Sequence, residues 1–139
     1  MEREVISCGR ESTIRDVARL MHTHEIGIVP VCDDTGHVIG TLTDRDLAVR
    51  VIAGGLVADV TFAKDVMSLE PITCHPDDEI SIAQTLMAQH KKGRIFCVET
   101  DGRLAGILSI ADTAQVESEE RTGRVFRAVT SRETAFVLW

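Results

Sequence analysis

Two seven-residue segments carry the residue types that could bind a phosphorylated nucleoside. They are residues 40–46 and 106–112, and both read Gly-x-Leu-Ser/Thr-x-x-Asp. The hydroxyl of Thr43 or Ser109 is expected at a helix start, where unpaired backbone N–H groups and the helix dipole attract phosphate. The carboxylates of Asp46 and Asp112 follow three residues later. Each has two acceptor oxygens, which suits the two hydroxyls of a ribose.

The same spacing also predicts a purely structural role. Ser/Thr-x-x-Asp is typical of a capping box, in which hydroxyl and carboxylate satisfy the N–H groups that a helix start leaves unpaired. Gly40 and Gly106 remove a side chain where a ligand would approach the backbone closely. The motif occurs twice at one offset, which favours ligand binding, and the two roles are compatible if the aspartate turns outward.

Charge and hydropathy limit the classes of partner. The chain has 139 residues and a net charge of −7. Nucleic-acid binding needs clustered Lys and Arg, and the one tight basic group is Lys91, Lys92 and Arg94, so we expect no nucleic-acid partner. No apolar run approaches the roughly 18 to 20 residues that span a bilayer, and residues 1–4 lack the pattern of a secretory signal. We expect a cytoplasmic protein without a membrane partner.

Neither a metal site nor a catalytic centre is predicted. The four cysteines are Cys8, Cys32, Cys74 and Cys97. They show no CxxC spacing and are interpreted as small buried hydrophobes, with a bridge between two of them left open. His22 and His24 do not form a standard metal spacing with Cys32. No P-loop, GxGxxG or recognisable nucleophile is present, so no enzymatic activity is expected.

The chain repeats itself. Sliding it by 66 positions aligns residues 1–46 with residues 67–112 without a gap, and 13 of the 46 pairs are identical. The identities fall mainly on apolar and glycine positions. A fixed internal period indicates one supersecondary unit present twice. One such unit alone would bury too little surface, so we expect the two copies to share a core.

Each repeat is predicted to follow the order β-α-β-β-α. The fold class is α/β (α+β), with two pseudo-symmetric repeats packed through their sheets. The predicted elements are strands 4–7 and 71–74, strands 28–32 and 95–98, strands 38–42 and 104–108, and second helices that begin near Thr43 and Ser109. The predicted divisions are repeat one at 1–55, a linker at 56–66, repeat two at 67–118, and a C-terminal helix with an apolar tail at 119–139.

This combination resembles cystathionine β-synthase (CBS) domains arranged as a CBS pair, or Bateman module, of the standalone prokaryotic type. Residues 27–31 (Gly-Ile-Val-Pro-Val) are similar to the family's second-strand consensus, and residues 40–46 closely match its third-strand consensus. The resemblance covers about residues 1–118. It implies a regulatory homodimer for signal transduction, with clefts between the repeats. These clefts commonly bind AMP, ADP, ATP or related ligands such as S-adenosylmethionine or NAD.

The resemblance also implies a set of site residues. The matched positions are Asp46 and Asp112 for the ribose, Thr43, Ser109 and Arg94 for the phosphate, and Ile6, Ser7, Ile72 and Thr73 beside the adenine. For Arg94 a second interpretation stays open, that of a solvent-exposed charge at a strand edge.

The repeats differ where a ligand would bind. Ile28 stands in repeat one where repeat two has Arg94, so the two clefts are predicted to differ in charge. Phe96 stands where repeat one has Pro30, which predicts crowding or stacking in one cleft. Ile28 in place of an arginine, together with the apolar residues 136–139, keeps a second hypothesis open. In it, a CBS pair binds no ligand and acts as a dimerisation or protein-docking module.

Overall fold

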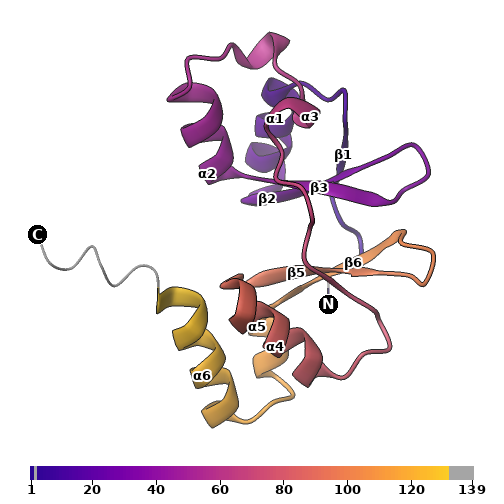
Figure 1. Cartoon of the computed structure of the whole chain (residues 1–139), viewed down its shortest axis with the longest axis vertical. Coiled ribbons are helices and arrows are strands. Elements are labelled where there is room, and N and C mark those ends of the chain that lie inside the picture. The colour runs from indigo at the N-terminus through magenta and orange to yellow at the C-terminus, as the bar shows by residue number, and fades with distance from the viewer. Residues whose placement is uncertain (2, 132–139) are drawn as a thin grey trace, which may run out of the picture. The chain divides into compact units, whose positions relative to one another are not determined.

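The chain divides into two compact units (Figure 1). The computed structural model describes Met1 and residues 3–131. The repeat-one unit comprises Ile6–Pro71 and Asp101–Leu104, and the repeat-two unit comprises Met1–Val5, Ile72–Thr100 and the chain from Ala105 onward. The apolar tail predicted after the C-terminal helix lies outside the described residues.

A three-stranded sheet organises the repeat-one unit. β1 (Cys8–Gly9) pairs in parallel with β2 (Ile28–Cys32), which pairs antiparallel with β3 (Val38–Thr43). The turn between β2 and β3 passes through Gly36, whose φ of +89° is a conformation that glycine adopts without strain. The helices of this unit are α1 (Ile14–His24), α2 (Asp44–Asp46), the π-helix η1 (Leu47–Ile52), the 3-10 helix η2 (Ala58–Val60) and α3 (Ala63–Val66).

The core of this unit lies between α1 and the sheet. The Thr13 hydroxyl caps α1 by accepting from the backbone N–H of Asp16 at 3.2 Å. The helix then buries apolar residues at helical spacing, as predicted. The buried apolar residues of the core are Cys8, Ile14, Val17, Met21, Val29, Val31, Leu42, Leu47, Val51, Ala63 and Val66.

The repeat-two unit has the same plan. Its sheet has the order β4 (Thr73–Cys74), β5 (Arg94–Val98), β6 (Leu104–Ser109), and its helices are α4 (Ile80–His90), α5 (Ile110–Ala114) and α6 (Glu119–Thr130). The buried apolar core consists of Cys74, Ala83, Met87, Ile95, Cys97, Leu108 and Val125. The predicted helix after Asp112 breaks at residues 115–118, and α6 begins as a new helix. Within α6, Arg124 pairs with Glu120 at 2.8 Å, as their spacing favours.

The predicted 66-residue period holds for the first helix and for the second and third strands of each repeat. Helix α4 begins and ends 66 positions after α1, and the same offset relates β5 to β2 and β6 to β3. It also relates two pairs of left-handed residues: Glu25 and Lys91 have φ values of 53° and 54°, and Gly36 and Gly102 have 89° and 88°. The prediction of one supersecondary unit present twice is confirmed.

The prediction of a strand at residues 4–7 is wrong. The first strand is β1, and it begins at Cys8, where the residue pairs with Val31 of β2. Val5 belongs to the repeat-two unit and Ile6 to the repeat-one unit, so the chain passes from one unit to the other within this segment, and the register with β2 begins only at Cys8. β4 is likewise shorter than predicted and covers Thr73–Cys74 alone.

In the described part of the chain, no helix has the length and apolar character needed to cross a bilayer.

Candidate functional site

The first candidate corner lies where β3 passes into α2. Thr43 Oγ1 accepts a hydrogen bond from the backbone N–H of Asp46 at 3.1 Å, and Asp46 Oδ2 accepts from the backbone N–H of Thr43 at 2.9 Å. Hydroxyl and carboxylate therefore form a capping box. The structural role that the sequence left open is present here. The second carboxylate oxygen, Oδ1, takes no part in the cap.

The second corner repeats this geometry where β6 passes into α5. Ser109 Oγ accepts from the N–H of Asp112 at 3.1 Å, and Asp112 Oδ2 accepts from the N–H of Ser109 at 2.9 Å. The distances equal those of the first corner. At both corners one carboxylate oxygen and the hydroxyl hydrogen lie outside the cap, so the cap and a ligand can use different atoms of the same residues.

Arg50 is a residue of the first corner that the sequence analysis missed. Its Nε lies 3.7 Å from Asp46 Oδ1, and its Nη1 donates to the backbone carbonyl of Val66 at 2.7 Å. The Asp46 side chain is 17% exposed. The i,i+4 spacing of Asp46 and Arg50 on one helix was the available signal. The counterpart of Arg50 in repeat two is Val116, so this cation belongs to the first corner alone.

Asp112 is more open and has different charged neighbours. Its side chain is 35% exposed, and Oδ1 lies 3.9 Å from the amino group of Met1. The N–H of Ser109, which donates to the carboxylate, is the main cause that holds the pKa of Asp112 below its usual range. The positive charges of the Met1 amine and of Arg94 act in the same direction. This carboxylate is therefore anionic at neutral pH.

Arg94 stands at the edge of the second corner. It is exposed and is the first residue of β5. The carbonyl of the preceding Gly93 accepts from the backbone N–H of Ile110 at 2.8 Å, which joins the start of β5 to the start of α5. In repeat one the equivalent bond runs from Asp44 to Gly27, and Ile28 pairs with Thr43. The cation in one repeat and the isoleucine in the other thus occupy matching places in the two sheets. Because Arg50 brings a cation to the first corner from another position, a difference in charge between the two clefts stays a prediction.

The four residues predicted beside the adenine lie at or before the first strand of each unit. Ile6 and Ser7 precede β1, and Ser7 is exposed. Ile72 is half-buried and packs against the repeat-two core, and its carbonyl accepts from the N–H of Phe96 at 3.1 Å. Thr73 is the first residue of β4 and pairs with Phe96. Ile72 and Thr73 therefore lie along the strand that begins at Arg94.

The structure gives Gly40 and Phe96 packing roles that differ from the ligand-related roles expected from the sequence. The space at Gly40 is filled by the chain itself, because a Cβ there would lie 2.5 Å from Met67 Sδ and 3.0 Å from the carbonyl oxygen of Ser68. The backbone of Thr41 exchanges two hydrogen bonds with Ser68 at the same place. The expectation that Gly40 admits a ligand to the backbone is wrong. Phe96 is 2% exposed and fully packed in the protein.

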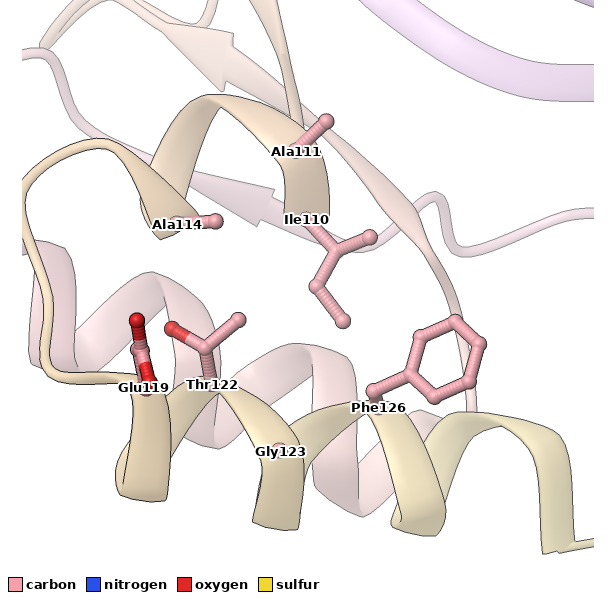
Figure 2. Close-up of a pocket in the computed structure, with 7 residues that line it drawn as sticks. All are labelled: Ile110, Ala111, Ala114, Glu119, Thr122, Gly123 and Phe126. Atoms are coloured by element: carbon pink, nitrogen blue, oxygen red, sulfur yellow. The ribbon is translucent and has the colours of Figure 1, made fainter.

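A hollow of about 480 Å³ lies between α5 and α6 (Figure 2). Its lining consists of Ile110, Ala111, Ala114, Glu119, Thr122, Gly123 and Phe126. None of the predicted site residues lines it, and its one charged lining residue, Glu119, is an anion. The hollow can therefore hold an apolar group but offers no cation for a phosphate. No group of three or more His, Cys, Asp or Glu residues in the described chain is arranged to hold a metal ion.

The chain resembles CBS-domain proteins in sequence. The CBS domain family model matches residues 1–52 and 63–118. The CBS domain-containing protein YhcV of Bacillus subtilis is 36% identical over 114 residues, which are 82% of this chain and 79% of YhcV. An uncharacterized protein of Methanopyrus kandleri is 35% identical over 115 residues, and the match covers 83% of this chain but 59% of that relative. The inosine-5'-monophosphate dehydrogenase of Bifidobacterium longum is 30% identical over 118 residues, which are 21% of that enzyme.

Solved structures have the same fold. A crystal structure of Hypoxic Response Protein I with two coordinated zinc ions matches with a TM-score of 0.77 and 28% identity over 85% of this chain and 95% of that one. CBSX2 in complex with AMP matches with a TM-score of 0.70 at 21% identity, over 81% and 86% of the two chains. The CBS domain pair of protein MJ0100, with 5'-methylthioadenosine and S-adenosyl-L-methionine, matches with a TM-score of 0.72 at 21% identity, over 83% and 92%.

Proposed function

This chain belongs to the CBS-domain family, as two CBS repeats, and we propose that it is a cytoplasmic regulatory module that binds an adenine nucleotide or a related adenosyl ligand. Its role is regulatory rather than catalytic. The similarity to the inosine-5'-monophosphate dehydrogenase of Bifidobacterium longum spans 21% of the length of that enzyme. Ligand binding changes the output by favouring one arrangement of a homodimer over another, which requires the ligand to interact differently with the two arrangements.

One observation carries the proposal: the hydroxyl–carboxylate corner occurs twice with matching geometry, and each leaves Oδ1 of its aspartate outside the cap. A carboxylate oxygen that lies outside the cap at a helix start, beside a hydroxyl, can accept from ribose hydroxyls in charge-assisted hydrogen bonds. Two proteins of the same fold, each 21% identical to this chain, are described with AMP and with adenosyl ligands. They support the class of ligand.

The repeat-two corner is our first choice for the phosphate. Arg94 brings an exposed guanidinium to the strand end beside Ser109 and Asp112, and guanidinium is well suited to pair with phosphate. In repeat one, Ile28 offers no charge, and Arg50 already donates to the Val66 carbonyl and lies beside Asp46. We expect the repeat-one corner to prefer a ligand without a phosphate, such as a nucleoside.

The aspartates are tested by calorimetric titration, with AMP and ATP for the Asp112 corner and with adenosine for the Asp46 corner. Asp112→Ala and Asp46→Ala should each weaken binding at their own corner by about 1.5–3 kcal/mol, or roughly ten- to a hundredfold. Alanine at position 112 also removes the cap, so Asp112→Asn is measured beside it. The asparagine amide oxygen still accepts from the Ser109 N–H, and only the charge of the side chain is lost. Ser118→Ala, which removes the cap of α6, is the control for a purely structural effect. Unchanged affinity in both alanine variants would refute the assignment.

Arg94 is tested by comparing AMP with adenosine. If the guanidinium holds the phosphate, Arg94→Ala weakens AMP binding about tenfold or more and leaves adenosine binding unchanged. Arg124→Ala, which removes an exposed arginine of α6, should change neither. Equal losses for AMP and adenosine in Arg94→Ala would show that Arg94 acts without contact to the phosphate.

A second function is favoured by the capping boxes themselves. Both aspartates already serve helix starts, and Asp46 also lies beside Arg50, so the motif has a structural explanation without any ligand. In that case the CBS pair acts as a dimerisation or protein-docking module. A thermal-shift screen with AMP, ADP, ATP, NAD and S-adenosylmethionine at millimolar concentration separates the two functions, because specific binding raises the melting temperature by mass action. Sedimentation velocity on the same samples measures the homodimer.

A further inference from the structure

Cys74 and Cys97 face each other across two paired strands. They are register partners in the parallel β4–β5 pair, and their sulfur atoms lie 3.3 Å apart. Both residues are almost fully buried, at 4% and 2% exposure. Neighbouring strands lie about 4.8 Å apart, which falls within the roughly 4.4–6.8 Å range of Cα separations that a disulfide spans. Small rotations of the two side chains would therefore bring the sulfur atoms to bonding distance.

We propose that Cys74 and Cys97 form a reversible disulfide that joins β4 to β5, with a small hydroperoxide as the oxidant. The two residues lie 23 positions apart in sequence, and all of α4 lies between them. The bond would close this segment covalently. β4 has two residues and two register pairs with β5, so the disulfide would fix a strand that few backbone contacts now hold.

The surroundings of the pair assign different roles to the two sulfur atoms. Either thiol of the pair can donate the hydrogen bond that joins the two sulfur atoms. The hydrogen bond with Cys74 is the main cause that lowers the pKa of Cys97; the positive charges of the Met1 amine and Arg3 act in the same direction, and burial opposes them. The same bond, with burial second, raises the pKa of Cys74. Since the thiolate is the nucleophile, Cys97 is the attacking residue and Cys74 resolves the intermediate.

The reaction balances in two steps. The Cys97 thiolate attacks the terminal oxygen of the hydroperoxide, the O–O bond breaks, and the alkoxide leaves as an alcohol after taking a proton, which yields a sulfenic acid on Cys97. The Cys74 sulfur then attacks the Cys97 sulfur and the S–O bond breaks. The hydroxide leaves as water after taking the Cys74 proton. Two thiols and one hydroperoxide thus give one disulfide, one alcohol and one water, and a dithiol reverses the change.

The test maps disulfides in the full chain after treatment with hydrogen peroxide. The reduced protein is oxidised, its free thiols are alkylated, and the digest is analysed by mass spectrometry without reductant. We expect a peptide that contains Cys74 linked to a peptide that contains Cys97, and loss of this product after dithiothreitol. The disulfide should also raise the midpoint of thermal unfolding by several degrees, because it restricts the unfolded chain.

Variants separate this pair from the other two cysteines. The double variant Cys8→Ser/Cys32→Ser should form the same cross-linked peptide at the same rate. In Cys74→Ser, a dimedone-type probe should label Cys97 as a sulfenic acid. In Cys97→Ser, Cys74 should react at least tenfold more slowly. If either single variant fails to fold, the map of the unaltered chain and of the double variant still decides the outcome. Alkylated Cys74 and Cys97 in peroxide-treated protein, with or without a bridge between Cys8 and Cys32, would overturn the proposal.

Discussion

Gln84 and Arg121 join helices α4 and α6 through a hydrogen bond in which Arg121 Nε donates to Gln84 Oε1 at 2.8 Å. The Gln84 side chain is fully buried, and its Nε2 donates to the Thr113 hydroxyl of α5 at 3.0 Å. Arg121 also donates to the carbonyl of Ser81 at 3.3 Å. One buried amide therefore connects three helices, and its oxygen and nitrogen both have partners.

Removing this amide should destabilise the repeat-two unit. Gln84→Ala leaves Arg121 and Thr113 without their partner at a buried site, so we expect the free energy of unfolding to fall by about 1–3 kcal/mol. Urea unfolding followed by circular dichroism measures the change. Gln89→Ala, on the exposed face of the same helix, should stay within about 0.5 kcal/mol of the unaltered protein. Equal midpoints for Gln84→Ala and Gln89→Ala would contradict the role of the amide.

Two glycine-to-alanine substitutions should act in opposite directions. A Cβ at Gly40 would lie 2.5 Å from Met67 Sδ, so Gly40→Ala must displace packed groups and should cost about 1–3 kcal/mol of stability. Gly123 lies within α6 and a Cβ there meets nothing within 4 Å. Gly123→Ala should therefore add roughly 0.8–1 kcal/mol through helix propensity. The denaturant midpoints of the two variants are compared with that of the unaltered protein. A higher midpoint for Gly40→Ala would contradict the prediction.

The two residues that end α1 and α4 offer sites for stabilisation. Glu25 and Lys91 adopt left-handed backbone conformations with φ of 53° and 54°, which cost side-chain-bearing residues more than glycine. We expect Glu25→Gly and Lys91→Gly each to raise stability by about 0.5–1 kcal/mol. Thr23→Gly, placed inside α1, should instead lower stability by about 1 kcal/mol or less. Thermal unfolding should give a higher midpoint than that of the unaltered protein for Glu25→Gly and Lys91→Gly, and a lower midpoint for Thr23→Gly.

Asp33 should titrate at unusually low pH. The hydroxyl of Thr35 donates to its carboxylate, and with the backbone N–H groups of His37 and Thr35 it lowers the pKa of Asp33 to about 2. Since the folded pKa lies below the unfolded value of about 3.9, the contribution to stability is present above pH 4 and disappears as the pH falls towards 2. Carboxyl chemical shifts followed by NMR measure the pKa. In Thr35→Ala it should move up towards the ordinary value, and an unchanged pKa would exclude the hydroxyl as its main cause.

The elements of each repeat could be predicted because their signals are local. Thr43 and Ser109 lie three residues before their aspartates, and that spacing placed both helix starts correctly. This spacing alone could not distinguish a helix cap from a ligand site, because both roles use the same side chains. The missed ion pair of Asp46 and Arg50 was also local and could have been predicted from its i,i+4 spacing.

The prediction of a strand at residues 4–7 was wrong for a non-local reason. Its apolar residues fit a strand, but whether a segment becomes a strand depends on a partner beside it. The chain changes unit between Val5 and Ile6. Gln84 is a similar case, since its polar side chain on an otherwise apolar face has no local explanation and is satisfied by a residue 37 positions away.

By itself the sequence determined the repeat, its period, the order of elements and the family. These follow from apolar spacing, turn glycines and caps, which act over a few residues. Tertiary structure alone decided that Met67 fills the space at Gly40 and that Cys97 faces Cys74 across paired strands. It also placed Arg94 at the corner that holds Asp112. Such contacts join residues far apart in sequence, and only the folded chain brings their side chains within reach of one another.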